Sequence, residues 1–320
     1  MKRKKVLVIG GTGHIGSYLI PSLFARDYEV LVFSRGKTTP YPESFWEKEV
    51  KMLTVDREKE EQTGHWQALI EEIQADIIID IICFEPESAQ ILIDTLTGKD
   101  VHLLSCGTVW VYGKTRIVPT PETAPRLPEN DYARKKTIIE DKLLQATRED
   151  KIKATIIHPG HITGPGKTFV TPFGDHNPET LQKIIDGKEI YLLDGGFSTL
   201  HHVHPQDVAS LFLRAIEQEN KTIGESFNCG APEAMTFWGL GEYFASLFGK
   251  KFYFQNISLE EYTEKFGYPE EAAQHVRQGC CVSMLKAQEV LNFAPHYSAR
   301  EAVASATDDL IKRGILKVNK

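Results

Sequence analysis

The chain has 320 residues, of which 41% are hydrophobic and 25% charged, and its formal net charge is −7. This is an ordinary globular composition, long enough for one large α/β domain or for such a domain with a smaller appendage. The negative charge argues against nucleic acid and anionic membranes as partners, because no basic field offsets phosphate repulsion. No stretch approaches about 18 apolar residues, so no membrane span is predicted.

The five cysteines are odd in number and show no CxxC spacing, which favours a reduced, cytoplasmic protein. The chain starts with the basic stretch MKRKK, and only VLVIGG follows it. That apolar run is too short for a signal peptide. We therefore expect a polar lead-in to a buried strand.

Short apolar runs bounded by turn residues alternate with helix-length segments along the first half of the chain: KVLVIGG, EVLVFSRG, VKMLTVD, DIIIDIICF, HLLSCG and ATIIHPG. Strands that are apolar on both faces and separated by helices are typical of parallel strands in βαβ units. Helices are expected over residues 14–26, 66–74, 86–97 and 131–148. The pattern predicts an α/β fold with a doubly wound parallel sheet of the Rossmann type.

The regular alternation ends after residues 158–178. Beyond that point, short strands near 189–193 and 224–229 mix with expected helices over residues 178–186, 205–219, 236–248, 258–265, 283–291 and 299–313. We expect an NAD(P)-binding Rossmann domain over residues 1–165. A smaller α/β substrate-binding region is expected over residues 166–320, with some of its segments returning to the Rossmann sheet.

The segment VLVIGGTGHIG places three glycines between the first expected strand and the first helix. Such glycines permit a tight turn, a close approach of the backbone to a pyrophosphate, and packing of the helix on the strand. The helix N-terminus then meets the negative charge of the phosphates. The alternative, a glycine turn without a ligand, does not account for the strand–turn–helix setting. The predicted cofactor-binding residues of this loop are Gly10, Thr12, Gly13, His14, Ile15 and Gly16.

The end of the second expected strand, VLVFSRGK, bears on which dinucleotide is bound. An NAD site would place Asp or Glu there to accept a hydrogen bond from the ribose 2′-hydroxyl, whereas this chain has Ser34, Arg35 and Lys37. These side chains suit a 2′-phosphate, so NADP is favoured over NAD, although Arg35 could instead stack on adenine or face solvent. Asp56, which closes the third strand, could meet the adenine amino group or simply cap a helix.

The stretch DYARKK puts a phenol and an ammonium four residues apart, on one face of an expected helix. A tyrosine has a pKa near 10 and is a poor base at neutral pH, but a nearby ammonium and an oxidised nicotinamide ring would lower that pKa. Thr108 follows the fifth expected strand and could hydrogen-bond the same substrate oxygen. Tyr132, Lys136 and Thr108 are therefore the candidate catalytic residues, the first two also contacting the cofactor.

Taken together, the chain resembles the extended short-chain dehydrogenases/reductases, in the NAD(P)-dependent epimerase/dehydratase group that includes the sugar epimerases. GGTGHIG is similar to that family's cofactor loop, GTVWVYG to its Ser/Thr-x-x-Val-Tyr-Gly segment and YARKK to its Tyr-x-x-x-Lys motif. HPGHITGPG is similar to its Arg-Pro-Gly…Gly-Pro turn, and HHVHPQDVA to its segment ending His-Val-x-Asp-Val-Ala. The resemblance implies a Thr108–Tyr132–Lys136 triad and a cofactor held by Arg35 and Asp56 besides the glycines.

Several positions depart from the family pattern. Val109 and Trp110 stand where dehydratases of the family carry an acidic pair, which argues against 4,6-dehydration. Leu200 stands where nucleotide-sugar enzymes often hold an arginine aimed at the diphosphate, and His158 replaces the arginine usual before Pro-Gly. A smaller or undecorated sugar or polyol is therefore an alternative to a sugar nucleotide.

Histidines are frequent near the expected strand ends, at His158, His161, His201, His202 and His204. No cysteine or carboxylate spacing accompanies them, so no metal site is predicted. His161, just past a strand end, is expected to line the substrate pocket together with Thr108 and Trp110. The charge run DREKEEQ over residues 56–62 is interpreted as a solvated loop and helix start.

The leading hypothesis is an enzyme that moves a hydride at a secondary alcohol of a sugar or sugar-nucleotide-like substrate, either as an epimerase or as an oxidoreductase. The alternatives are an NADP-dependent carbonyl reductase of a non-sugar small molecule, and a non-catalytic RNA-binding or regulatory protein that keeps the dinucleotide fold. The resemblance also implies a homodimer through the helix that carries Tyr132 and Lys136, where IIEDKLL over residues 138–144 forms an apolar stripe.

Overall fold

The computed structural model describes residues 3–38, 40–41, 46, 50–267 and 270–318. The strands in the described residues are β1 (Lys5–Ile9), β2 (Glu29–Ser34), β3 (Lys51–Thr54), β4 (Ile77–Asp80), β5 (His102–Cys106), β6 (Lys153–Pro159), β7 (His161–Ile162), β8 (Ile190–Leu193), β9 (Thr199–Leu200), β10 (His202–Val203), β11 (Ser226–Cys229), β12 (Met235–Thr236) and β13 (Phe254–Ile257).

The α-helices in the same residues are α1 (His14–Phe24), α3 (Arg57–Thr63), α4 (Trp66–Ile73), α5 (Pro86–Leu96), α6 (Asp131–Arg148), α7 (Pro178–Ile185), α8 (Pro205–Glu217), α9 (Glu219–Thr222), α10 (Phe237–Ser246), α11 (Leu259–Phe266), α12 (Glu270–Gln278), α13 (Leu285–Leu291) and α14 (Ala299–Lys312). Two short 3₁₀ helices, η1 (Val109–Tyr112) and η2 (Asp194–Gly196), complete the described elements.

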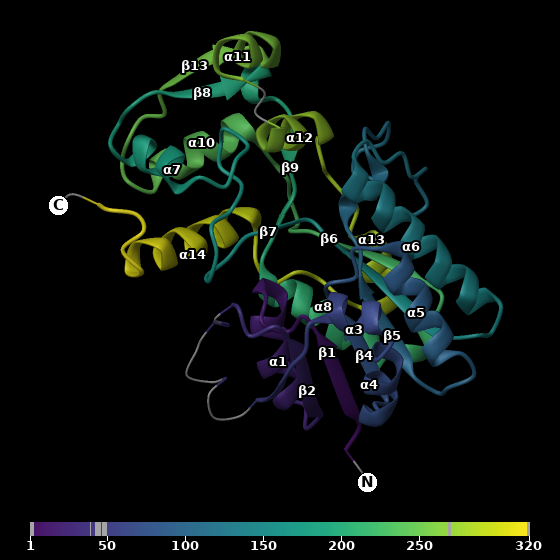
Figure 1. Cartoon of the computed structure of the whole chain (residues 1–320). Helices are drawn as coiled ribbons and strands as arrows, with labels where there is room; N and C mark the ends of the chain where they lie inside the picture. The colour runs from purple at the N-terminus through teal and green to yellow at the C-terminus, as the bar shows by residue number, and fades with distance from the viewer. Residues whose placement is uncertain (1–2, 39, 42–45, 47–49, 268–269, 319–320) are drawn as a thin grey trace.

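A seven-stranded sheet in the order β11-β6-β5-β4-β1-β2-β3 forms the centre of the molecule (Figure 1). All of its neighbouring strands run parallel. The chain winds outward from β1 in both directions, so the strand order reverses between β1 and β4, and ligands of such sheets bind at the carboxyl ends near this reversal. The predicted Rossmann-type α/β fold is confirmed.

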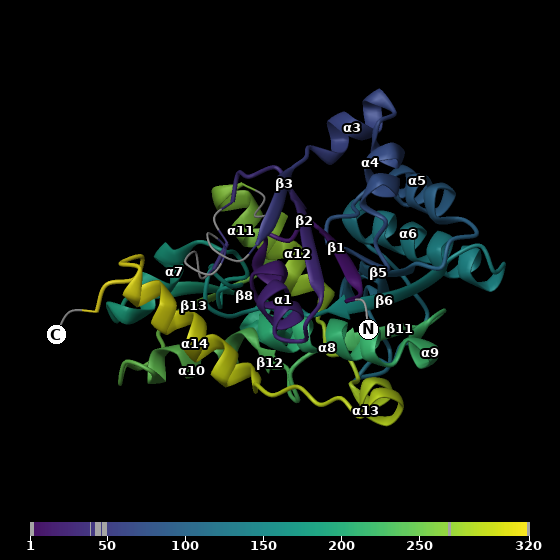
Figure 2. The same ribbon diagram turned by 90° about the horizontal axis from the view of Figure 1, so that it is seen from below.

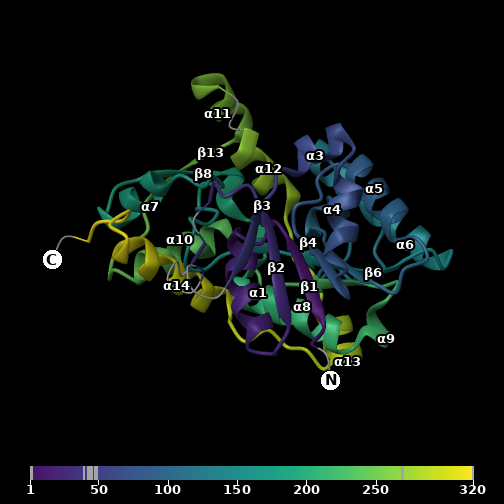
Figure 3. The ribbon, with the colours of Figure 1, turned by 60° about the horizontal axis from the view of Figure 1, so that its bottom comes forward.

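The two faces of the sheet are covered by different helices, as the side-chain alternation of β1 illustrates. Val6 and Val8 pack in the core between the sheet and helices α1 and α8, whereas Leu7 and Ile9 pack in the core beneath α4, α5 and α6. Successive side chains of a strand point to opposite faces, so a strand buried on both sides must be apolar throughout. Figure 3 shows the helices on either side of the strands.

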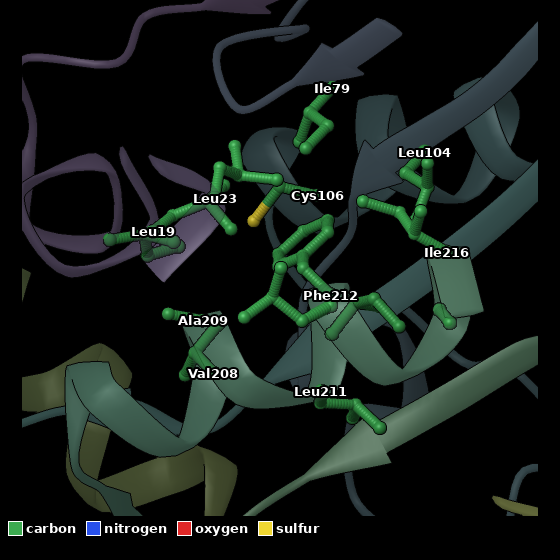
Figure 4. Packing of buried hydrophobic residues seen from close by; sticks show 14 of the residues in the cluster. Leu19, Leu23, Ile79, Leu104, Cys106, Val208, Ala209, Leu211, Phe212 and Ile216 are labelled. Carbon is green, nitrogen blue, oxygen red and sulfur yellow. The ribbon is translucent and has the colours of Figure 1, made fainter. Parts of the chain in front are cut away.

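The core beneath α1 and α8 is close-packed around Phe212, which is completely buried (Figure 4). Leu19 and Leu23 of α1 meet Ile79 of β4 and the side chain of Cys106, at the end of β5, in this core. Burying one such apolar side chain stabilises the fold by roughly 1.5–3 kcal/mol. The packing therefore fixes the strand ends that carry the candidate site.

The C-terminal part of the chain has a second core, formed mainly by α7, α10, α12, α14 and the strand pairs β8–β13 and β9–β12. Figures 1 and 2 show these elements grouped to one side of the large sheet. β11 lies in the same half of the sequence but forms an edge of the large sheet beside β6. The boundary at residue 165 between two domains stays a prediction.

Two sequence expectations are wrong in the structure. The charge run after Asp56 is not fully solvated, because Arg57 is buried under the carboxyl ends of the strands. The apolar stripe of α6 does not face outward, because Ile139 and Leu143 pack against the sheet and only Ile138 is strongly exposed. Helix α12 was not expected at all.

None of the described helices has the length and apolar character that a membrane crossing requires.

Candidate active site

The glycine turn after β1 leads directly into helix α1. A side chain at Gly16 would collide with the backbone of Gly11, so α1 packs closely on the turn only because residue 16 lacks a Cβ. Gly13 is the N-cap of α1, with no side-chain hydrogen bond to the first turn and no acidic residue in it. The first N–H groups of the helix are therefore available to an anion, which fits the pyrophosphate of a dinucleotide.

A cavity of about 530 Å³ opens beside this turn. It lies between the ends of β1, β2 and β3 and the first turns of α3 and α5, and its lining includes Gly10, Thr12, Gly13, Ser34, Arg35, Lys37 and Asp56. Its size and its place next to the helix N-terminus fit the adenosine half of a dinucleotide. We call it the adenosine cavity.

The polar side chains after β2 and β3 differ in whether they bond the protein or face the cavity. The hydroxyl of Ser34 lies 2.8 Å from that of Thr12 and accepts a hydrogen bond of 3.2 Å from the amide of Gly36, so Ser34 braces the turn. Arg35 is exposed at the cavity and is free to reach a ligand phosphate. Asp56 is the N-cap of α3, but its carboxylate makes no capping hydrogen bond and faces the same cavity.

Arg57 forms a buried ionic wall of the adenosine cavity that sequence reasoning missed. Its guanidinium donates to Glu61 at 2.6 Å and to Asp80 at 2.8 Å, and it lies 5.4 Å from the ring of Trp66. Burial disfavours the charge, but the carboxylates of Asp80 and Glu61 hold the pKa of Arg57 above its usual range. Ser88 donates to the other oxygen of Glu61 at 2.6 Å and extends the network to α5.

Thr108 and Tyr132, predicted as catalytic residues, meet at one cavity. Thr108 follows β5 and is the N-cap of η1, where its hydroxyl accepts a hydrogen bond of 3.3 Å from the amide of Trp110. A hydrogen bond links Thr108 to the phenol of Tyr132 and lowers its pKa, but the desolvation of the phenol has the larger effect and raises the pKa of Tyr132 to about 12, even though 41% of the residue's surface is accessible. The lowered pKa predicted from the sequence is therefore not what the protein alone produces.

Lys136 is buried, and its ammonium is anchored by backbone oxygens rather than by a carboxylate. It donates to the carbonyl oxygens of Cys83 at 2.8 Å and Cys106 at 2.7 Å. It also lies 4.8 Å from the ring of Phe84 and 5.9 Å from that of Tyr132. An ammonium has three donors, so one N–H bond remains for a ligand hydroxyl.

A second cavity, of about 630 Å³, extends from Thr108 and Tyr132 toward α12 and α14. We call it the substrate cavity. His14 and Ile15 of the predicted cofactor loop line it rather than the adenosine cavity, so the start of α1 separates the two. His14 lies with Nε2 2.9 Å from the carbonyl oxygen of Pro165, and burial lowers the pKa of its imidazole to about 4.

Three histidines line the wall of the substrate cavity. The ring of His161 lies 5.3 Å from that of His275, which lies 5.5 Å from that of His176. Trp110 does not line the cavity directly but donates from its indole to Nε2 of His161 at 3.4 Å. Burial lowers the pKa of His275 to about 4 and that of His161 well below its usual value, so both rings are neutral at pH 7. No metal-binding group of three or more His, Cys, Asp or Glu side chains occurs among the described residues.

The far end of the substrate cavity carries two cations that the sequence did not reveal, Lys167 and Arg313. Asp309 of α14 brings them together, because one of its carboxylate oxygens accepts from Arg313 at 3.1 Å and from the amide of Gly166 at 2.8 Å. The described residues that line this cavity include no Asp or Glu. Arg313 is thus paired with Asp309, and Lys167 adds a second cation to this part of the lining.

The model of the NAD dependent epimerase/dehydratase family matches residues 6–230. The chain belongs to this family. It is an NAD-dependent enzyme of the extended short-chain dehydrogenase/reductase type, as the resemblance of its motifs implied.

Among curated proteins, the chain is similar to the chloroplast stem-loop binding protein of 41 kDa b of Arabidopsis thaliana, with 25% identity over 98% of this chain and 81% of that protein. It is also similar to a UDP-glucose 4-epimerase of Rhizobium leguminosarum bv. trifolii, with 26% identity over 96% and 98% of the two chains. Among solved structures, the UDP-glucose 4-epimerase of Thermotoga maritima with UDP-glucose has the same fold, with a TM-score of 0.75, 20% identity, and coverage of 97% and 99%.

Proposed function

We propose that the protein is an epimerase or oxidoreductase that transfers hydride at a secondary alcohol of a sugar-nucleotide-like substrate, with NADP preferred to NAD. The observation that carries the proposal is the convergence of Thr108, Tyr132 and the start of α1 on one cavity, whose far end is cationic. The bound nicotinamide supplies the chemistry of accepting or returning the hydride. The remaining tasks fall to the side chains of this chain.

Tyr132 is the proton carrier of the proposed reaction. With a pKa of about 12 it is protonated at neutral pH and suited to donate a proton to a keto oxygen. Removal of a proton from an alcohol needs a lower pKa, which the positive charge of an oxidised nicotinamide ring would favour. Thr108 holds the same oxygen, and the free N–H bond of Lys136 is available to the nicotinamide ribose.

Lys167 and Arg313 are proposed to bind the acidic part of the substrate. Leu200, which stands where related nucleotide-sugar enzymes often have an arginine, is fully buried and cannot reach the substrate. The cationic end of the cavity offers the missing positive charge from another part of the chain. His161 is proposed to contact the sugar next to Thr108, with Trp110 behind it orienting its ring through the hydrogen bond to Nε2.

The test is a screen of UDP- and dTDP-sugars, sugar phosphates and polyols with NAD and NADP. Cofactor reduction is followed by absorbance and epimer formation by NMR. Net reduction of added cofactor identifies an oxidoreductase, whereas epimer formation with stoichiometric bound cofactor identifies an epimerase. The Tyr132→Phe protein, purified in the same way, controls for contaminating activity. Turnover of only neutral, non-sugar ketones would contradict the proposed substrate class and favour a carbonyl reductase.

RNA binding is the second candidate function, because a relative that aligns with 98% of this chain is named a stem-loop binding protein. The cations Lys167 and Arg313 could contact phosphates, but the net charge of −7 opposes a large nucleic-acid interface. Filter binding with a stem-loop RNA at low salt decides the question. Tight binding with a steep salt dependence, lost in the Lys167→Glu protein, would favour this function.

We also propose a homodimer through the outer face of α5 and α6. This face exposes Ile138, which is 46% accessible, among charged side chains such as Arg134 and Asp141. Light scattering at micromolar concentration tests the assembly, and Ile138→Lys should weaken it. A monomeric mass for the unmodified protein would end this proposal.

A further inference from the structure

A buried polar chain lies beneath the loop that carries Thr108, and the proposed mechanism does not use it. At its centre is His158 of β6, whose side chain is 1% exposed. Nε2 of His158 lies 3.0 Å from a carboxylate oxygen of Glu140 in α6, and Nδ1 lies 3.2 Å from the hydroxyl of Tyr112 in η1. Glu140 comes one helical turn after Lys136, and Tyr112 ends the helical turn that follows Thr108.

The hydrogen bonds around Tyr112 determine where its proton lies. The amide nitrogen of Asn228 donates to the carbonyl oxygens of Thr120 at 3.2 Å and Ser283 at 3.3 Å, so its side-chain oxygen is the acceptor that faces Tyr112. Tyr112 donates its only proton to that oxygen, at 2.9 Å. The phenol oxygen is then an acceptor, and the hydrogen bond to His158 must come from an N–H at Nδ1.

The other ring nitrogen of His158, Nε2, faces the carboxylate of Glu140. Burial raises the pKa of the Glu140 carboxyl, but His158 and Arg126 lower it further, to about 2, so the group is an anion that only accepts hydrogen bonds. Arg126 forms an ion pair of 3.2 Å with the same carboxylate oxygen. His158 therefore bridges the hydroxyl of Tyr112 and the carboxylate of Glu140 through its two ring nitrogens, in the buried layer between β6 and α6.

His158 also contacts the backbone directly before Thr108. A Cβ at Gly107 would collide with the imidazole of His158, so the absence of a side chain at residue 107 lets the loop lie on the ring. One imidazole ring thus packs on the strand end before Thr108, bonds the end of η1 after it, and bonds the helix that carries Tyr132 and Lys136. These contacts join the two elements on which the catalytic side chains stand.

We propose that His158 is a positioning residue, a buried strut whose two hydrogen bonds set the distance between Thr108 and the Tyr132–Lys136 face of α6. The proposal rests on the proposed catalytic roles of those three residues. Proton transfer depends on the separation of Thr108 and Tyr132, and a displacement of about 1 Å can cost roughly 10²-fold in rate. Two rigid partners on opposite sides of one ring leave little room for such a displacement.

The strut can be broken without touching a catalytic side chain. Tyr112→Phe removes one buried hydroxyl, and Glu140→Gln removes the anion while keeping its shape. The matched control is Thr155→Val, which removes a buried hydroxyl on the same strand. Thr155 bonds His102 at 2.8 Å and the carbonyl oxygen of Thr222 at 2.7 Å, near the start of β6 and away from both cavities.

Hydrogen exchange and steady-state kinetics are measured on all four proteins. In both strut variants we expect faster exchange over residues 107–113 and 131–136. With any substrate that the screen identifies, kcat should fall about 10- to 100-fold with KM changed less than about threefold, since displaced catalytic groups affect the reaction more than substrate binding. Thr155→Val should leave the exchange of both segments and kcat as they are.

Equal exchange of residues 107–113 and 131–136 in Tyr112→Phe, Thr155→Val and the unmodified protein would overturn the proposal. So would faster exchange in both strut variants with kcat unchanged, because the network would then be structural only. If the unmodified protein turns over no sugar derivative, the proposed function fails, yet exchange still shows whether His158 couples the two elements. Should Glu140→Gln not fold, Tyr112→Phe carries the test alone.

Discussion

The two cavities of the molecule differ in how much of the chain they need. All residues that line the adenosine cavity lie between Ile9 and Ser88, within the first βαβ units. The substrate cavity draws on residues from His14 to Ile315, which come from α1, the loop after β5, α6, β7, α12 and the segment after α14. One is a local product of a sequence motif, whereas the other exists only once the whole chain has folded.

The cavities also differ in charge. The adenosine cavity has charges of both signs and a buried guanidinium neutralised by Asp80 and Glu61. The described lining of the substrate cavity combines neutral, buried histidines with two cations and no carboxylate. Arg57 is buried with its carboxylates, whereas in the substrate cavity Arg313 pairs with Asp309 at 3.1 Å and the exposed Lys167 is the cation that the described ion pairs do not include.

The largest expected effect concerns the substrate cavity, at Tyr132. Tyr132→Phe removes the proton carrier but leaves the adenosine cavity untouched, so kcat should fall about 10²- to 10⁴-fold while the affinity for NADPH stays nearly constant. Stopped-flow turnover and nicotinamide fluorescence measure the two quantities. Turnover at a near-normal rate would reduce Tyr132 and Lys136 to a phenol and a cation without a catalytic role.

The next effect belongs to the adenosine cavity alone. Arg35→Asp exchanges a donor for a 2′-phosphate with an acceptor for a 2′-hydroxyl, so the ratio of NADP to NAD affinity should fall about 10- to 100-fold, in keeping with a charge-assisted hydrogen bond. Fluorescence titration with NADPH and NADH gives this ratio. The neighbouring cation Lys37, changed to Met, is the matched control with a smaller shift. An unchanged ratio in the Arg35 variant would leave the preference for NADP without support.

The difference between the adenosine cavity and the substrate cavity explains which residues could be predicted from the sequence and which could not. The strands follow from local apolar runs, and the glycine turn with residues 34, 35 and 56 lies among the first three strands. Local patterns were therefore enough to predict these residues as candidates, and the structure places them at one cavity. Arg57 was missed because a charged run normally indicates a solvated surface, and its partner Asp80 lies in another strand.

The substrate cavity was predicted less well for a related reason. His275 stands on α12, a helix that was not expected, and Arg313 comes near the end of the chain. No local pattern tells that α12 and α14 fold over the strand ends. Thr108, Tyr132 and Lys136 were predicted together because a known family motif carries the long-range information that a single sequence lacks.

A smaller effect is expected at the cationic end of the substrate cavity. Lys167→Met and Arg313→Met each remove one charge aimed at the substrate but leave Tyr132 in place, so KM for a sugar nucleotide should rise about tenfold with kcat nearly unchanged, as for a lost ground-state contact. The rise should shrink at high salt, because exposed charges are screened. A neutral sugar should show no difference between these variants and the unmodified protein. Equal effects on neutral and anionic substrates would exclude charge recognition at this end.

The smallest effect tests the neutral histidines of the substrate cavity through stability. The pKa of His275 in the folded protein is about 4, below the ordinary value of 6.5, because burial disfavours its charged form. Between these two values the unfolded chain binds a proton that the folded chain does not, so acid favours unfolding over this range; the effect sets in about one pH unit above 6.5, where the unfolded chain begins to bind the proton. Lowering the pH from 7.5 to 6 should therefore reduce the free energy of unfolding by about 0.8 kcal/mol through this group.

Replacing His275 with Gln should remove that share of the acid sensitivity, since glutamine does not titrate. Urea unfolding at pH 7.5 and pH 6 measures the difference for both proteins. The control is His65→Gln, which removes an imidazole whose side chain is 74% exposed and lines neither cavity. If His275→Gln loses stability with acid as steeply as the unmodified protein, His275 binds its proton in the folded state. The substrate cavity would then carry more positive charge near pH 6 than the burial of His275 implies. An anionic substrate would in that case be attracted by His275 as well as by Lys167 and Arg313.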